Sequence, residues 1–171
     1  MQNTCRGGIT GEIWMKFAEF VCFEATRCEL EATTRNDAVR ELVTSLAGAG
    51  RLREEDAEKI TRAIIRRENE ASTGLGKGVA VPHIKLADVS APVAAVGLSS
   101  EGIDFKSLDE QPVYSIILLL SPDDNTDNHL KAMECIFGHL QKDRFRSFLR
   151  QADTNEYIKD LLLEADEEPS L

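Results

Sequence analysis

Val113-Tyr-Ser-Ile-Ile-Leu-Leu-Leu120 is the most apolar stretch of the 171-residue chain. Eight residues are far too few to span a bilayer, and a continuous apolar run of this length is typical of a strand buried on both faces. A strand of that kind needs helices above and below the sheet that contains it. The stretch therefore predicts the central strand of an α/β domain.

Shorter patterns on both sides of this stretch predict the rest of the fold. Val79–Val81 and Val93–Leu98 are apolar runs of strand length, and Cys28–Ala32 alternates enough to be a first strand. Apolar residues at helical spacing predict helices over about 34–47, 54–69, 128–142, 143–151 and 154–163, with Thr33 or Thr34 as the first N-cap. This order predicts a layered α/β domain with helices on both faces of a mixed sheet.

The composition, 42% hydrophobic and 29% charged, is that of one globular domain. Residues 1–14 show no periodic pattern and are expected to be an extension, with Met15 as a candidate natural start. The domain is expected over 15–165, and an acidic tail over 166–171. No apolar core of a secretory signal and no membrane segment is visible in the sequence, so a cytoplasmic protein is predicted.

The formal charge of −10 should repel nucleic acid and anionic membranes, so neither is an expected partner. The charge is uneven, because six basic residues and only two acidic ones lie between Lys59 and Leu86. We call the six the basic island: Lys59, Arg62, Arg66, Arg67, Lys77 and Lys85. Two interpretations stay open, an anion-binding site and an ordinary solvated helix face.

The cysteines and histidines do not have the spacing of a metal site. The four cysteines contain no CxxC pair, and Cys22, Cys28 and Cys135 sit among apolar neighbours that favour buried, unreactive thiols. His129 and His139 are ten residues apart on one predicted helix, so their side chains point in different directions. We expect no metal, and a structural role for His139.

Ser72-Thr-Gly-Leu-Gly-Lys-Gly78 is a glycine-rich connection in front of the strand at Val79. Backbone N–H groups in such loops can bind phosphate. The spacing matches neither the Walker pattern nor a GxGxxG turn that opens a helix, so a nucleotide site is weakly supported. A tight turn explains the glycines equally well.

His83 has the most specific setting of the three histidines. It follows Pro82 at the predicted end of a strand, beside the glycine-rich loop and the basic island. A neutral imidazole nitrogen can attack phosphorus if donors hold the phosphoryl oxygens, and Arg67 and nearby amides are candidate donors. The alternative is a strand-end histidine with ordinary hydrogen bonds. His129 follows the central strand and is either a second active histidine or a helix-entry residue.

The segment Arg67-Glu68 with Ser72-Thr-Gly-Leu-Gly-Lys-Gly-Val-Ala-Val-Pro-His83 resembles the type 2 enzyme IIA family of the bacterial phosphotransferase system, which includes fructose, mannitol and nitrogen-regulatory members. Asp109-Glu-Gln-Pro-Val113, Leu118-Leu-Leu-Ser-Pro122 and Asn128-His-Leu130 match in order and spacing. The resemblance implies a three-layer α/β/α sandwich around a mixed β-sheet, covering about residues 15–165.

The resemblance also implies a function and a site. His83 would be the phosphoryl acceptor, with Arg67 and His129 beside the phosphoryl group and a phosphate loop formed by Ser72, Thr73, Gly74 and Gly76. The donor would be HPr or a paralogue, no cofactor is needed, and the phosphate would pass to a IIB cysteine or serve a nitrogen-related regulatory role. The alternative is a binding regulator whose phosphorylation state gates contact with a kinase, transporter or transcription factor. Ile84 departs from the small residue common after the histidine.

Overall fold

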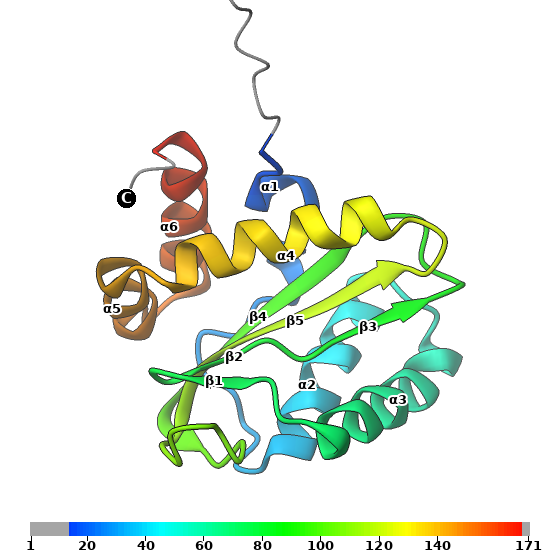
Figure 1. Ribbon diagram of the computed structural model, residues 1–171, viewed down its shortest axis with the longest axis horizontal. Coiled ribbons are helices and arrows are strands. Elements are labelled where there is room, and N and C mark those ends of the chain that lie inside the picture. Colours follow the sequence, from blue (N-terminus) through cyan, green and yellow to red (C-terminus); the bar gives the residue numbers. More distant parts are fainter. Residues whose placement is uncertain (1–13, 169–171) are drawn as a thin grey trace, which may run out of the picture.

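The computed structural model describes residues 14–168 and shows a five-stranded mixed sheet between two helical layers (Figure 1). One layer packs α2 and α3 against the sheet, and the other packs α1, α4, α5 and α6. The predicted three-layer α/β/α fold is thereby confirmed. The helices are α1 (Phe17–Phe20), α2 (Arg35–Gly48), α3 (Ala57–Glu70), α4 (Thr126–Leu140), α5 (Asp143–Gln151) and α6 (Asn155–Glu167).

The apolar stretch predicted to be central forms β5 (Val113–Pro122), which has neighbours on both edges. β4 (Val93–Ile103) pairs with one edge in antiparallel fashion. β2 (Val79–Ala80) and β3 (His83–Leu86) follow one another along the other edge, both parallel to β5. Side chains of β5 alternate between the two cores, so the strand is apolar without interruption.

The break between β2 and β3 lies at Val81 and Pro82. Proline has no N–H to give to the ladder, but its carbonyl still accepts a hydrogen bond from Leu119 N at 2.9 Å. The chain then resumes pairing, so His83 begins β3 and does not end a strand as predicted. The glycine-rich connection, expected to be a loop, contains a strand, because β1 (Gly74–Gly76) pairs antiparallel with β2.

The predicted strand at Cys28–Ala32 is wrong. This segment and the residues before it run along the outer edge of β4. Single bridges there join Val21 to Ala94 and Arg27 to Gly97. A 3₁₀ turn, η1 (Phe23–Ala25), interrupts the pairing between them. Beyond the second bridge, the amides of Glu31 and Ala32 donate to the Glu41 carboxylate at 3.1 and 2.9 Å, so few donors remain for a ladder.

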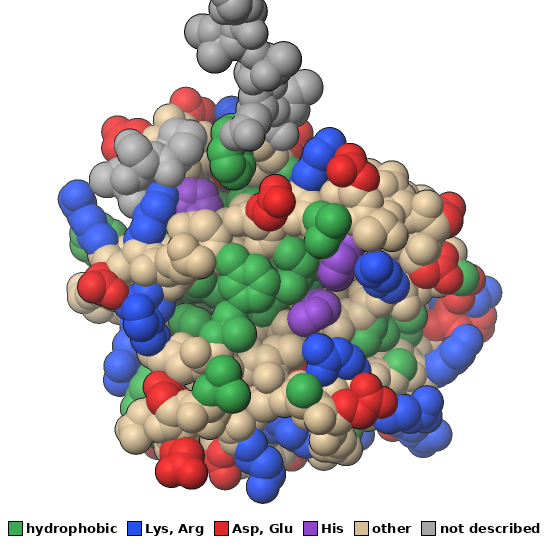
Figure 2. All heavy atoms as spheres, viewed as in Figure 1, with side chains coloured by type: hydrophobic (Ala, Val, Ile, Leu, Met, Phe, Trp, Pro, Cys, Tyr) green, Lys and Arg blue, Asp and Glu red, His purple; other side chains and the backbone are tan. Residues whose placement is uncertain are grey.

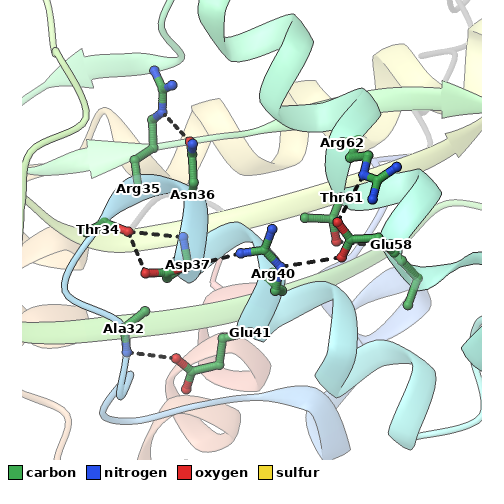
Figure 3. A network of polar contacts seen from close by, with 11 residues as sticks. Ala32, Thr34, Arg35, Asn36, Asp37, Arg40, Glu41, Glu58, Thr61 and Arg62 are labelled. Atoms are coloured by element: carbon green, nitrogen blue, oxygen red, sulfur yellow. Dashed lines mark hydrogen bonds and ion pairs between the residues drawn. The ribbon is translucent and has the colours of Figure 1, made fainter.

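Side-chain contacts near the surface cap the start of α2 and join α2 to α3. Thr34 is the N-cap of α2 and accepts from Asp37 N, as predicted for one of the two threonines. A second 3₁₀ turn, η2 (Glu54–Asp56), precedes α3, which therefore starts three residues later than expected. Figure 3 shows Arg40 between Asp37 of its own helix and Glu58 of α3, at 3.1 and 3.4 Å.

The last helix is longer than the sequence predicted. α6 continues to Glu167, so Asp166 belongs to the folded domain and not to a tail that begins at 166. Its carboxylate accepts hydrogen bonds from the amides of Phe17 and Ala18 at 2.7 and 3.0 Å, which satisfies two free N–H groups at the start of α1. The two ends of the described chain are joined there. Residues 1–13 and 169–171 lie outside the described residues.

His139 is buried in the same region, between the rings of Phe17 and Phe145 at centroid distances of 5.0 and 5.3 Å. Its Nδ1 has no hydrogen-bond partner among the described residues. Burial, and to a smaller extent Lys142, lowers the pKa of His139, while Asp166 opposes the shift. This packing agrees with a structural role.

We expect the protein to lose stability in mild acid. A histidine whose pKa is lowered in the folded state binds fewer protons folded than unfolded, so its stabilising effect is present above the ordinary histidine pKa of 6.5 and is lost as the pH falls below it. Each such histidine contributes at most about 1.4 kcal/mol per pH unit. Urea unfolding at pH 7.5 and 5.5 measures the slope. His139→Phe should flatten it, and an unchanged slope in a folded variant contradicts the prediction.

Candidate functional site

His83 and His129 lie together although 46 positions separate them in the sequence. Their ring centroids are 5.8 Å apart and the ring planes are inclined by 39°. His83 comes from β3, and His129 from the first turn of α4, which follows β5 after a short loop. Ile84 and Leu86 pack into the core under α2 and α3, so His83 and Lys85 face the α4 side of the strand.

Figure 2 shows two adjacent histidine side chains on one face of the molecule, with apolar side chains on one side and basic side chains close by. His83 is half-buried and His129 is 8% exposed. The His83 ring is therefore the more accessible of the two to solvent. This pair is the candidate functional site.

The tautomer of His83 follows from a single contact. Its Nδ1 lies 2.7 Å from the carbonyl oxygen of Val81, two residues earlier in the chain. A carbonyl oxygen only accepts hydrogen bonds, so Nδ1 carries the proton and donates it. The unprotonated nitrogen is then Nε2, on the opposite side of the ring. A histidine held in this way presents a lone pair that can act as a nucleophile.

His129 is held by the end of the central strand. Its Nδ1 lies 2.8 Å from the hydroxyl of Ser121, which is fully buried in β5. Burial lowers the pKa of His129 most, and the charges of His83 and Lys85 lower it further. The lowered pKa favours the neutral form of the His129 ring.

Arg67 is half-buried in the last turn of α3, and its Nη1 donates to the carbonyl of Ala71 at 2.9 Å. This bond caps the end of the helix and uses one of the five guanidinium N–H donors. Within the described residues, no hydrogen bond joins Arg67 to either histidine. Its role beside the site stays a prediction.

The polar groups of the predicted phosphate loop already have hydrogen-bond partners within the protein. Ser72 donates to the Phe105 carbonyl at 2.6 Å and accepts from Gly74 N at 3.0 Å. Thr73 donates from both its amide and its hydroxyl to Glu68. Gly74 is closely packed, since a Cβ there would lie 2.3 Å from the Ser107 hydroxyl oxygen.

Gly76 has a different reason to be glycine. Its φ of 91° lies in the left-handed region that disfavours a side chain, and the next amide, Lys77 N, donates to Asp109 at 3.0 Å. Glycine is therefore needed in this hairpin for backbone shape and close packing, and contact of the loop with a phosphoryl group stays a prediction.

The basic island does not form one patch. Arg62 pairs with Glu58 on the same helix at 3.1 Å, and Lys77 lies at the tip of the β1–β2 hairpin. Lys85 is the member that acts on the site, through its charge near His129. The sequence did not reveal that Val81 contacts His83 and that Ser121 contacts His129. The one available signal was that Ser121 follows the apolar strand directly and marks its carboxyl end.

Two other features of the described residues bear on chemistry. Burial raises the pKa of the Cys135 thiol to about 12, so this cysteine is not a nucleophile at neutral pH. Between residues 14 and 168, no three His, Cys, Asp or Glu side chains lie close enough to hold a metal ion. In the same range, no helix is long and apolar enough to cross a bilayer.

Comparison with known proteins identifies the family. Residues 20–165 match the family described as the phosphoenolpyruvate-dependent sugar phosphotransferase system, EIIA 2. The chain belongs to this family. The match covers almost all of the described domain and confirms the resemblance seen in the motifs.

Relatives of this EIIA chain carry two kinds of description. The fructose-specific EIIA component of Haloferax volcanii is 32% identical, with 82% of this chain and 90% of that protein covered. The nitrogen regulatory protein of Pseudomonas aeruginosa is 34% identical, with 68% and 75% covered. The fructose-specific EIIABC component of Bacillus subtilis is 32% identical over 89% of this chain, which spans only 24% of that longer protein.

Solved structures agree with the fold. The nitrogen regulatory protein IIA-Ntr of Neisseria meningitidis superposes with a TM-score of 0.77 at 25% identity, covering 85% of this chain and 98% of that one. The Escherichia coli mannitol IIA domain superposes with a TM-score of 0.68 at 20% identity, covering 81% and 96%. The EIIA family as a whole has a phosphoryl-carrier or regulatory role.

Proposed function

We propose that this chain is a phosphohistidine carrier that accepts a phosphoryl group on Nε2 of His83. The observation that carries the proposal is the hydrogen bond from His83 Nδ1 to the Val81 carbonyl, because it leaves Nε2 unprotonated. The neutral ring of His129, with its centroid 5.8 Å from that of His83, lies where it can donate to a phosphoryl oxygen. No cofactor is needed for this step.

In the proposed transfer, the Nε2 lone pair of His83 attacks the phosphorus of a phosphohistidine on an HPr-type phosphocarrier. The new N–P bond forms while the N–P bond of the donor breaks, and the donor imidazole keeps the electron pair. The proton on Nδ1 of His83 stays on the Val81 carbonyl side throughout. Lys85, with Arg67 if its remaining donors reach the site, stabilises charge on the phosphoryl oxygens.

Two downstream routes follow from the relatives. One solved complex joins the mannitol IIA domain to the phosphorylated IIB domain of Escherichia coli. By analogy, this chain would pass its phosphate to a IIB domain. The likeness to nitrogen regulatory proteins supports a second route, in which the phosphorylation state gates contact with a regulated kinase or transporter. Both routes place the protein in the cytoplasm, where phosphoenolpyruvate is made.

The test is phosphorylation of the intact chain with phosphoenolpyruvate, enzyme I and an HPr-type phosphocarrier. We expect one phosphate per chain, labile in acid and stable in base, as a phosphohistidine is. Nitrogen-15 and phosphorus-31 NMR should place it on Nε2 of His83. A chain that stays unmodified with several HPr-type donors contradicts the carrier proposal, and phosphate on Nδ1 contradicts the geometry.

Adding a purified IIB domain to the phosphorylated chain separates the two routes. Transfer to the IIB cysteine within seconds supports transport. A phosphorylated chain that retains its phosphate with every IIB domain tested supports the regulatory route.

A further inference from the structure

Glu68 is a carboxylic acid in the interior, 2% exposed, in the last turn of α3. Both of its oxygens are used by one residue: Oε2 accepts from Thr73 N at 3.0 Å, and Oε1 accepts from the Thr73 hydroxyl. A buried carboxylate is costly unless its lone pairs are satisfied, so this arrangement is maintained against a substantial desolvation penalty. The site described above does not use Glu68.

Thr73 connects Glu68 to the nucleophile through the backbone. The carbonyl of Thr73 accepts from Val81 N at 3.2 Å, and the carbonyl of Val81 accepts from His83 Nδ1 at 2.7 Å. Each of Thr73 and Val81 contributes its N–H and its carbonyl, which belong to two successive peptide groups joined at the Cα, so the path fixes the orientation of the backbone and is not one conjugated chain. We call this series from Glu68 through Thr73 and Val81 to His83 the hydrogen-bond relay.

The relay is shielded from water along most of its length. Thr73 is 5% exposed and Val81 is 0% exposed. Hydrogen bonds are electrostatically stronger in such surroundings, so each one constrains the backbone that carries it. Glu68 fixes the Thr73 backbone and the Thr73 carbonyl fixes the Val81 amide. The direction of the Val81 carbonyl that holds the His83 proton therefore depends on Glu68 through the position of the backbone.

We propose that Glu68 is a positioning residue, which holds His83 in the Nδ1–H tautomer through Thr73 and Val81. The proposal rests on the proposed function for its link to phosphoryl transfer, but its statement about the tautomer stands alone. Histidine free in water prefers the other tautomer, with the proton on Nε2, which would block the nucleophile. Glu68 would thereby keep Nε2 unprotonated without touching the substrate or the ring.

The test measures the His83 tautomer directly by two-bond proton–nitrogen NMR in the wild type and in Glu68→Ala. Wild-type His83 should be mainly Nδ1–H. In Glu68→Ala, we expect the ratio of Nε2–H to Nδ1–H to rise at least about threefold, as the loss of one hydrogen bond predicts. The maximal rate of phosphoryl transfer should fall in proportion to the lost Nδ1–H fraction, and therefore by no more than the factor by which the ratio rises. The KM for the donor should change less than about twofold.

Glu68→Gln keeps the side-chain shape and covers the case in which Glu68→Ala does not fold. An amide oxygen is a weaker acceptor than a carboxylate, so the tautomer should shift in the same direction by a smaller amount. Folded variants of both kinds that keep the wild-type tautomer ratio overturn the proposal.

Glu41 offers the matched control. It also accepts two backbone hydrogen bonds with its carboxylate, from Glu31 and Ala32, and it lies on α2 outside the relay (Figure 3). Glu41→Ala should leave the His83 tautomer and the transfer rate unchanged. An equal tautomer shift in this variant assigns the effect to general loosening and overturns the proposal. If the wild type is never phosphorylated, the carrier function fails while the tautomer measurement still decides on Glu68.

Discussion

Replacement of His83 by Ala is expected to abolish phosphorylation of the chain. Ala has no lone pair to attack phosphorus, and the other histidine of the site, His129, is only 8% exposed, so its ring is far less open to a phosphoryl donor. Removal of a nucleophile usually costs more than about a thousandfold in rate. The measurement is the amount of acid-labile phosphate after incubation with phosphoenolpyruvate, enzyme I and the phosphocarrier.

The same assay on His129→Ala supplies the comparison. This variant keeps the acceptor and loses a donor beside it, so we expect a rate about a hundredfold lower with the same final phosphate per chain. Circular dichroism confirms that both variants fold. Complete loss in folded His129→Ala, together with residual phosphate in His83→Ala, would make His129 the primary acceptor and reverse the assignment.

Phe17→Ala is expected to lower the free energy of unfolding by about 3–5 kcal/mol, the range for removal of a fully buried phenylalanine side chain. Phe17 is 0% exposed, stacks on Phe145 at a centroid distance of 6.0 Å and packs on His139. Its amide also donates to Asp166 of α6. The ring and the amide together hold α1 where α4 and α6 meet. Urea denaturation at pH 7.5 measures the loss.

Phe148→Ala makes the same chemical change at the surface of α5. Phe148 is 36% exposed, and its ring has the Arg144 guanidinium 5.4 Å from its centroid. We expect a loss below about 1 kcal/mol, as for most surface substitutions. Similar losses in the two variants would mean that the N-terminal helix contributes little to the core and would contradict this account of the fold.

Sequence patterns predicted the elements whose burial is regular along the chain. Val113–Leu120 was expected to be the buried strand at the centre, and it is. The helix stripes were also right, and Thr34 is the N-cap among the two threonines expected, because such features depend on neighbours within about four residues. Errors occur where distant groups compete for the backbone. At Cys28–Ala32 the Leu30 amide pairs with β4, while the side chain of Glu41 takes the amides of Glu31 and Ala32.

The candidate site shows the same division. The chemistry of His83 and its likeness to a known family were visible from residue types and spacing. The tautomer of His83 was not visible in the sequence. It depends on the direction in which the Val81 carbonyl points where the strand pairing is interrupted at Pro82. The relay was not visible either, because Glu68 and Thr73 look like part of a motif and not like supports of a ring that lies fifteen and ten residues further along the chain.

The sequence by itself determined that this protein is a layered α/β domain and, through the resemblance of its motifs to a known family, predicted His83 as a phosphoryl acceptor. Apolar periodicity and a local motif are enough for that, because both are written in adjacent residues. Only the tertiary structure decided which nitrogen of His83 is unprotonated and how far from it the ring of His129 lies. Those properties arise from hydrogen bonds and contacts between β3, β5 and α4, and the physical cause is the placement of groups that are far apart in the chain.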